Sequence, residues 1–223
     1  MSIDQERKDR IERLIKSLPD LTGGQLRWIE SIVEQFSQSS SFTRDSESDL
    51  ITPCMLQDFG DALRIHHCFS VEPFRKDRFE YVLQRVTTLC GKKAELAPSG
   101  NPGYDIIIDD ERFSLKTQAD KGIRVEELYI SKFMELGQGK WTDDPADLFG
   151  LREQFLTHLK SYDRILSLRT LQREPEQWRY ELVEIPKPLL REARQGRLEM
   201  RLKSTQMPKP GYCYVSGSEG DKF

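Results

Sequence analysis

The fold is decided by the stretch Asn101-Pro-Gly-Tyr-Asp105-Ile-Ile-Ile-Asp-Asp-Glu-Arg-Phe-Ser114-Leu-Lys116-Thr-Gln118. The glycines and the proline before Tyr104 interrupt any helix, and the β-branched run that follows to residue 108 predicts a short strand. The polar residues 109–111 suit a turn, and residues 112–118 predict a second strand. The stretch is therefore expected to form a β-hairpin.

Two turn lengths are compatible with this hairpin. With a two-residue loop at Asp109 and Asp110, Asp105 lies opposite Ser114, whereas a four-residue loop places Asp105 opposite Lys116. Because side chains alternate along a strand, Asp105, Ser114 and Lys116 share one face in either register. The other face is apolar and holds Ile106, Ile108, Phe113 and Leu115. The hairpin thus brings a carboxylate and an ammonium group close together at a surface.

An acid followed across a hairpin by x-x-Lys is the pattern of the PD-(D/E)xK nucleases. Asp105 and Lys116 fit this pattern, but Ser114 stands where the general pattern has Asp or Glu. A carboxylate oxygen is a hard ligand suited to Mg²⁺, and a lysine beside it can hold or help to deprotonate the attacking water. The same two residues would equally suit a solvated ion pair of little energetic value. The hairpin alone leaves both interpretations open.

The composition indicates an ordinary soluble protein. The chain has 223 residues, of which 37% are hydrophobic and 32% charged, enough for one core and at most a small appendage. No apolar run approaches the roughly 20 residues of a membrane span, and the charged N-terminus indicates no signal peptide. We therefore expect a cytoplasmic protein. The net charge of -3 requires any nucleic-acid surface to be local.

One such local surface is predicted near the C-terminus. The stretch from Lys187 to Lys209 holds seven basic and two acidic residues, a net charge of +5 that opposes the rest of the chain. A charge run is usually a solvated face, but beside a metal-dependent nuclease site it would neutralise phosphates. We expect it to contact DNA.

The N-terminal part is predicted to be helical. Apolar residues at helical spacing predict helices over residues 4–18 and after Thr22, followed by a Ser-rich linker that ends near residue 48. Residues 1–48 are accordingly expected to belong to the same unit as the nuclease domain, residues 49–223. Thr52 and Pro53 begin a third helix. His66 and His67 within it point in different directions, which favours packing over metal binding.

A fourth helix is predicted from Ser70 to Cys90, capped by Ser70 and ended by Gly91. Its expected buried stripe consists of Phe74, Val82, Val86 and Leu89. Glu80 lies in the middle of this helix. On an exposed face Glu80 is an ordinary solvated charge. Turned toward the hairpin, it supplies the second carboxylate that Ser114 does not.

The rest of the chain alternates between predicted strands and helices. Strands are expected at residues 128–130, 165–169 and 178–185, and helices at residues 131–137, from residue 144, and at residues 188–194. This order predicts an α/β (α+β) domain with a central mixed sheet flanked by helices. A strand at residues 212–215 is followed by a turn, and Phe223 begins the return strand. The sequence is thus expected to be C-terminally shortened, ending inside a hairpin.

Blocks spread along the chain carry a more specific resemblance. They are Asp58-Phe-Gly-Asp61, His66-His67, Phe79-Glu80, Asn101-Pro-Gly-Tyr-Asp105, Leu115-Lys-Thr117, Ile130-Ser-Lys132, Met134-Glu-Leu-Gly137, Leu182-Val-Glu-Ile-Pro-Lys187 and Pro208-Lys-Pro-Gly-Tyr212. In these blocks the chain resembles the SmaI-type type II restriction endonucleases, of the PD-(D/E)xK-like nuclease superfamily. Tyr104, Gln118 and residues 91–99 depart from the family pattern.

The resemblance implies a homodimeric, Mg²⁺-dependent endonuclease that cuts both strands of a short GC-rich palindrome similar to CCCGGG. It also implies a cognate DNA methyltransferase in the same system. It maps the metal-binding acid onto Asp105 and the catalytic lysine onto Lys116, with a small residue at Ser114. We take Asp105, Lys116, Glu80 and Ser114 as candidate catalytic residues. The expected metal ligands are Asp105, the carbonyl of Leu115, and Glu80.

Two alternatives stay open at this level. A catalytically weak or inactive relative would bind duplex DNA without nicking it. A PD-(D/E)xK nuclease with another role would nick structures or ends with no fixed site. A helical adaptor without a nucleic-acid partner is a distant third alternative, and it would show no salt-dependent DNA affinity at all.

Overall fold

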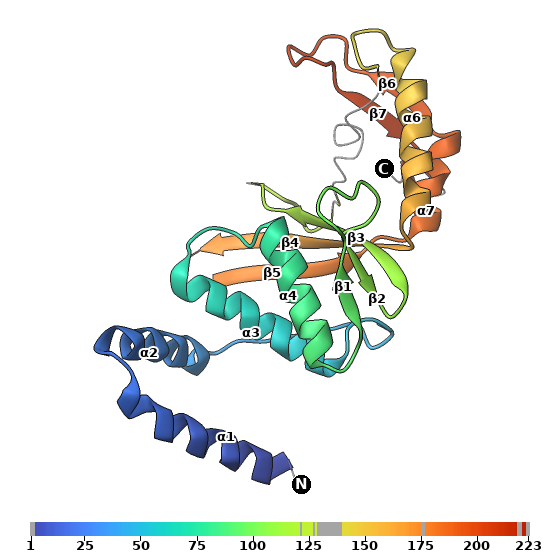
Figure 1. The fold of residues 1–223 in the computed structure, drawn as a ribbon. Helices are drawn as coiled ribbons and strands as arrows, with labels where there is room; N and C mark the ends of the chain where they lie inside the picture. Colours follow the sequence, from blue (N-terminus) through green and yellow to red (C-terminus); the bar gives the residue numbers. More distant parts are fainter. Residues whose placement is uncertain are drawn as a thin grey trace. The chain divides into compact units, whose positions relative to one another are not determined.

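The computed structural model describes residues 3–120, 122–126, 128, 140–174, 177–217 and 220–221. The chain divides into two compact units, Met1–Glu72 and Pro73–Phe223 (Figure 1). No helix in these described ranges is long and apolar enough to cross a membrane.

The first unit is built from helices. They are α1 (Ile3–Ser17), a 3-10 turn (Leu18–Asp20), α2 (Gly23–Ser37) and α3 (Pro53–Phe69). The Thr22 hydroxyl accepts a hydrogen bond from the Gln25 N–H at 3.3 Å, and the Gln25 side chain accepts one from the Thr22 N–H at 2.8 Å. This capping box fixes the start of α2. The sequence-predicted helices are confirmed here.

Polar contacts join α2 to α3. Arg64 of α3 donates to the carbonyls of Gln35 and Gln38 at the end of α2, at 2.6 and 2.9 Å. The rings of His66 and His67 hydrogen-bond the carbonyls of Glu72 and Ser70 at 2.8 and 2.9 Å. The two histidines therefore take part in local packing, as the sequence favoured.

The second unit is organised by a five-stranded sheet in the order β1-β2-β3-β4-β5 (Figure 1). The strands are β1 (Ala94–Leu96), β2 (Ile106–Ile108), β3 (Glu111–Gln118), β4 (Arg164–Glu174) and β5 (Gln177–Glu184). β3 and β4 are parallel, and the other neighbours are antiparallel. The predicted α+β fold with a central mixed sheet is confirmed.

Helix α4 (Lys76–Leu89) lies against β1, β2 and β3. Its inner face consists of Phe79, Leu83, Val86 and Thr87, all buried. The predicted start at Ser70 is wrong, because Ser70 closes α3 and the backbone is not helical again until Lys76. The predicted stripe is also partly wrong, since Leu89 is 58% exposed.

A second core joins this sheet to the C-terminal elements, which are α6 (Asp147–His158), α7 (Lys187–Arg191), and the hairpin of β6 (Arg197–Met200) and β7 (Gly211–Tyr214). A short pair, β8 (Ser216–Gly217) and β9 (Gly220–Asp221), follows. Ile165 of β4 and Ile185, which directly follows β5, pack in one cluster with Phe155, Leu159 and Tyr162. The strand expected at residues 128–130 and the helix expected at residues 131–137 lie, except for Leu128, outside the described residues.

Candidate active site

The β2–β3 hairpin has a two-residue loop. Ile108 pairs with Glu111 and Ile106 with Phe113, so the four-residue alternative is wrong. Asp109 and Asp110 between the strands have φ values of 46° and 73°. Positive φ at both loop residues is the geometry that matches the twist of a hairpin, and Asp tolerates it better than most residues. The apolar face is confirmed, because Ile106, Ile108, Phe113 and Leu115 are at most 1% exposed.

Asp105 lies directly before β2 and is bound to β3 on both its backbone and its side chain. Its N–H donates to the carbonyl of Phe113 at 2.8 Å. Its carboxylate Oδ2 accepts a hydrogen bond from the Leu115 N–H at 2.6 Å. The carboxylate is thereby fixed beside the backbone between Ser114 and Lys116. Its side chain is 18% exposed, so it remains accessible to a small ligand.

Lys76 and Glu80 of α4 complete a cluster with Asp105, which we call the carboxylate–lysine cluster. The Lys76 Nζ lies 2.8 Å from Asp105 Oδ1 and 3.4 Å from Glu80 Oε1. Lys76 and Glu80 are one helical turn apart and so share a face of α4. Of the two readings that the sequence left open for Glu80, the structure supports the one that turns it toward the hairpin.

Sequence reasoning missed Lys76. Its i, i+4 spacing from Glu80 is a signal for a helical ion pair, but nothing local connects it with Asp105, which is 29 residues away. The hairpin and α4 had to be placed together before this contact became visible.

The cluster concentrates negative charge around one ammonium group. Burial raises the pKa of Glu80, and the Asp105 charge adds to this effect while Lys76 opposes it. Burial by itself would lower the pKa of Lys76, but the hydrogen bond and charge of Asp105, together with Glu80, outweigh it and raise that pKa. Lys76 therefore stays charged, and its charge is what lets the two carboxylates lie near one another.

Ser114 and Lys116 lie on either side of Leu115 on β3. Ser114 is 2% exposed and pairs with Ile165 of β4, whereas Lys116 is half-buried and pairs with Ser167. Because paired residues on neighbouring strands project to the same face, Ser114, Lys116 and Ser167 share one face. The structure brings Asp105 and Glu80 together around the Lys76 ammonium. It places Lys116 on β3, the strand to which Asp105 is hydrogen-bonded.

Tyr162 is a further residue that the sequence did not single out for chemistry. It is fully buried, and its hydroxyl has no hydrogen-bond partner in the described part of the chain. Burial raises the pKa of this phenol, with a contribution from the Asp105 charge. The Lys187 ammonium lies 5.3 Å from its ring centroid and donates to its carbonyl. Lys187 is therefore engaged in packing.

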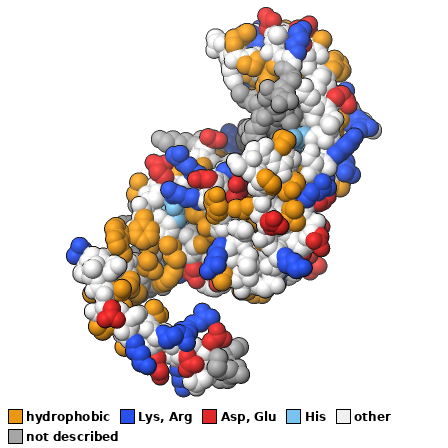
Figure 2. Space-filling model, viewed as in Figure 1, with side chains coloured by type: hydrophobic (Ala, Val, Ile, Leu, Met, Phe, Trp, Pro, Cys, Tyr) orange, Lys and Arg blue, Asp and Glu red, His pale blue; other side chains and the backbone are white. Residues whose placement is uncertain are grey.

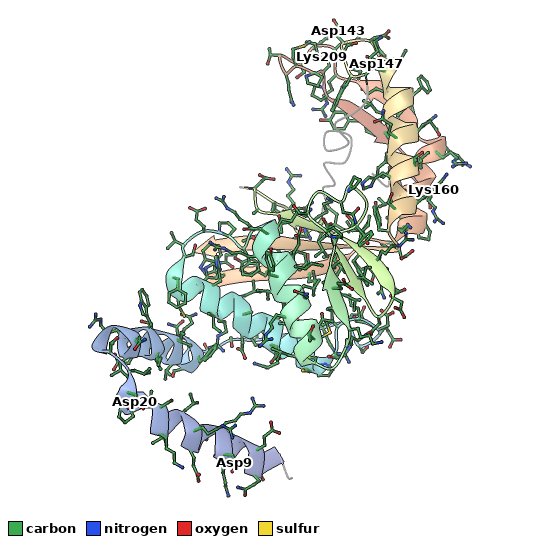
Figure 3. All side chains as sticks on the ribbon, in the orientation of Figure 1. Asp9, Asp20, Asp143, Asp147, Lys160 and Lys209 are labelled. Atoms are coloured by element: carbon green, nitrogen blue, oxygen red, sulfur yellow. The ribbon has the colours of Figure 1, made fainter. Side chains whose placement is uncertain are left out.

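Three other basic residues of the stretch from Lys187 to Lys209 have two kinds of surroundings. Arg197 and Arg201 stack on Tyr214 and Tyr212 of β7, with guanidinium-to-centroid distances of 4.7 and 4.4 Å, and both are exposed. Lys209 instead donates to the Ser204 carbonyl and lies in the same region as Asp143 and Asp147 (Figure 3). Lysine and arginine side chains also gather over the α6–α7 region (Figure 2).

Comparisons with known proteins identify the family of the chain. The mixed sheet and its flanking helices are consistent with the core of a restriction endonuclease. The model of the SmaI family, described as type II site-specific deoxyribonuclease, matches residues 14–222. The chain belongs to this family.

One relative is the type II restriction enzyme SmaI of Serratia marcescens. It is 39% identical over 201 residues, which cover 89% of this chain and 77% of the relative. No solved structure matches the chain.

Proposed function

We propose that this type II deoxyribonuclease hydrolyses both strands of a short GC-rich palindrome, similar to CCCGGG, with Mg²⁺. The observation that carries the catalytic part is the carboxylate–lysine cluster. Asp105 and Glu80 share one cation beside the Leu115 backbone, on the strand that also carries Lys116. The base sequence rests on the family resemblance.

The residues of the cluster fit a magnesium ion. Carboxylate and carbonyl oxygens are the ligands that this hard cation prefers, and the two carboxylates already accept a positive charge between them. Asp105, Glu80 and the Leu115 carbonyl would hold the ion. When bound, Mg²⁺ supplies a Lewis acid that neutralises charge on the phosphate under attack and eases deprotonation of a water molecule.

The protein side chains supply the remaining steps. Lys116 holds the attacking water in line with the scissile bond and stabilises the hydroxide formed from it. The water gives up a proton to solvent and its oxygen bonds to phosphorus while the bond to the 3′ oxygen breaks. The 3′ oxygen takes up a proton from solvent, which leaves a 5′ phosphate and a 3′ hydroxyl. Ser114 offers a hydrogen bond but no charge, so Glu80 is the second acid of the site.

The first experiment digests plasmid DNA that carries one CCCGGG site, with Mg²⁺ and with EDTA, beside a plasmid that lacks the site. Discrete Mg²⁺-dependent fragments from the first plasmid alone are expected. Asp105→Ala and Lys116→Ala should each lower the rate by at least about 100-fold. A wild-type cleavage rate in either variant would refute the catalytic role of the substituted residue. Salt-sensitive binding without cutting would favour an inactive relative, and nicking without a fixed site would favour another nuclease role.

We also propose that the exposed face of the β6–β7 hairpin binds DNA phosphates. Arg197 and Arg201 lie over tyrosine rings there, which orients their guanidinium groups while they remain exposed. Arg197→Gln and Arg201→Gln should each weaken duplex binding on every sequence and reduce the slope of log K against log salt by about one. Arg85→Gln, an exposed arginine of α4, is the control. Unchanged slopes in both variants would refute this surface.

A palindromic site suits a homodimer, because a two-fold protein axis matches the two-fold axis of the DNA. α1 and α2 expose large apolar side chains, among them Leu14, Trp28 and Val33. These helices are our candidate for the interface. An enzyme that cuts such a site in its own cell also requires protection, so we place it in the cytoplasm beside a cognate methyltransferase.

A further inference from the structure

We propose that Lys76 is an internal counter-ion of the metal site, which holds Asp105 and Glu80 together before the divalent ion binds and is displaced when it does. This inference rests on the proposed function, because it assumes that the carboxylate–lysine cluster is where the metal binds. In this role Lys76 competes with the metal ion for the carboxylate oxygens of Asp105 and Glu80. This competition sets the affinity of the site for the metal.

The contacts identify the atom for which lysine and metal compete. Asp105 Oδ2 is committed to the Leu115 N–H at 2.6 Å, and the other oxygen, Oδ1, lies 2.8 Å from the Lys76 Nζ. Glu80 Oε1 lies 3.4 Å from the same nitrogen. A metal ion bound by both carboxylates would need the oxygens that Lys76 now contacts. The ammonium and the ion exclude each other there.

The burial of the three side chains shows which one can move. The Lys76 side chain is 41% exposed, against 18% for Asp105 and 26% for Glu80. Asp105 is tied to β3 by two hydrogen bonds, whereas lysine has a flexible four-carbon stem and an ammonium that water solvates strongly. Lys76 can therefore be displaced without breaking backbone structure, whereas moving Asp105 would break its two hydrogen bonds to β3.

Binding of the divalent ion also changes the sign of the net charge at the site. Two carboxylates and one ammonium carry a net negative charge, which repels a DNA phosphate. Adding a divalent ion while Lys76 stays nearby makes the same group of charges net positive. Lys76 is the first residue of α4, where the helix dipole also favours an anion. The displaced ammonium is therefore available to a phosphate oxygen once the metal has arrived.

The test is calorimetric titration of the DNA-free protein with MgCl₂ and with CaCl₂, which needs no turnover. Lys76→Gln should bind either ion at least about tenfold more tightly than wild type, because a cation that competes for the same oxygens is gone. Lys76→Arg keeps the charge and should retain the wild-type affinity. Lys92→Gln, which removes a lysine paired with Asp109 at 3.1 Å on the hairpin turn, should change nothing.

Each result decides the question. Equal or weaker metal binding by Lys76→Gln, with a circular dichroism spectrum like that of wild type, would overturn the competitor role. Asp105→Asn separates this failure from a failure of the proposed function. If Asp105→Asn abolishes metal binding but Lys76→Gln does not tighten metal binding, only the competitor role of Lys76 is refuted. If metal binding does not depend on Asp105, both the proposed metal site and the counter-ion role of Lys76 are refuted.

Discussion

Single residues decide how well the β2–β3 hairpin holds Asp105. Asp110 has a φ of 73°, in the left-handed region where an L side chain costs energy and glycine does not. Asp110→Gly should raise the free energy of unfolding by about 0.5 kcal/mol, since relief of strain exceeds the extra chain entropy of glycine. Asp110→Ala, which keeps the strain, should lower it. Urea unfolding of the metal-free protein measures both, and a change of the same sign in the two variants would contradict this explanation.

His67 gives the first unit a pH dependence. Burial lowers the pKa of His67 to about 4, with a smaller contribution from the His66 charge, although its hydrogen bond to the Ser70 carbonyl opposes the shift. The unfolded chain, with a pKa near 6.5, therefore binds the proton more readily than the folded one. The stability contributed above pH 6.5 is lost as the pH falls from about 6.5 to 4.

Because the His67 ring is half-buried and solvent screens its charge, the stability lost on protonation is about 1–2 kcal/mol. Thermal unfolding at pH 7 and pH 5 should show a larger loss in wild type than in His67→Gln. The same loss in both proteins would place the titrating group elsewhere.

Local spacing predicted one relation within the candidate site. Strand alternation was enough to place Asp105 beside β3, the strand that carries Lys116. The turn length stayed open because Asp is an uncommon residue at positive φ. The direction of the Glu80 side chain and the contacts of Lys76 depend on how α4 packs against β1, β2 and β3. Sequence spacing does not predict this tertiary packing.

At the scale of elements, helix boundaries were the weakest predictions. Ser70 has the side chain of a helix N-cap, and its hydroxyl does accept a hydrogen bond from the Glu72 N–H at 3.1 Å. That bond closes a local turn after α3 instead of beginning α4. The helix starts after Arg75, whose side chain makes no capping bond. Competition between a turn and a cap for the same serine hydroxyl explains the error.

Two glycines near α6 predict opposite responses to the same substitution. Gly150 lies within α6, and a Cβ there would meet nothing within 4 Å. A Cβ at Gly196, which precedes β6, would lie 2.3 Å from the Sγ of Cys213 and 3.1 Å from the Tyr214 carbonyl oxygen. Gly150→Ala should stabilise the protein by about 0.5–1 kcal/mol through helix propensity. Gly196→Ala should destabilise it by about 1–3 kcal/mol through overpacking.

Chemical denaturation of the pair compares one added methyl group in two settings, so each variant is the control for the other. Stabilisation by Gly196→Ala would show that the backbone before β6 can move away from Cys213 and Tyr214, contrary to the close packing described above.

For the molecule as a whole, assembly connects the fold to double-strand cleavage. Leu14 and Val33 are 62% and 56% exposed on α1 and α2, and exposed apolar groups on neighbouring segments mark contact surfaces. If they form the dimer interface, the Leu14→Lys, Val33→Lys double variant should shift the light-scattering mass from twice the 26.0 kDa chain mass to a single chain. Two lysines facing their own copies across a two-fold axis repel as well as removing apolar contact.

The same variant should change the cleavage product. A dimer cuts both strands of the palindrome in one encounter and yields linear plasmid, whereas a single chain carries one carboxylate–lysine cluster and should accumulate nicked circles. Leu89→Lys, at a residue 58% exposed on α4, should leave mass and product unchanged. A double variant that remains dimeric and still produces linear DNA would exclude α1 and α2 as the interface. A wild-type chain that stays monomeric on its duplex would exclude the homodimer, because one site could not then reach both strands at once.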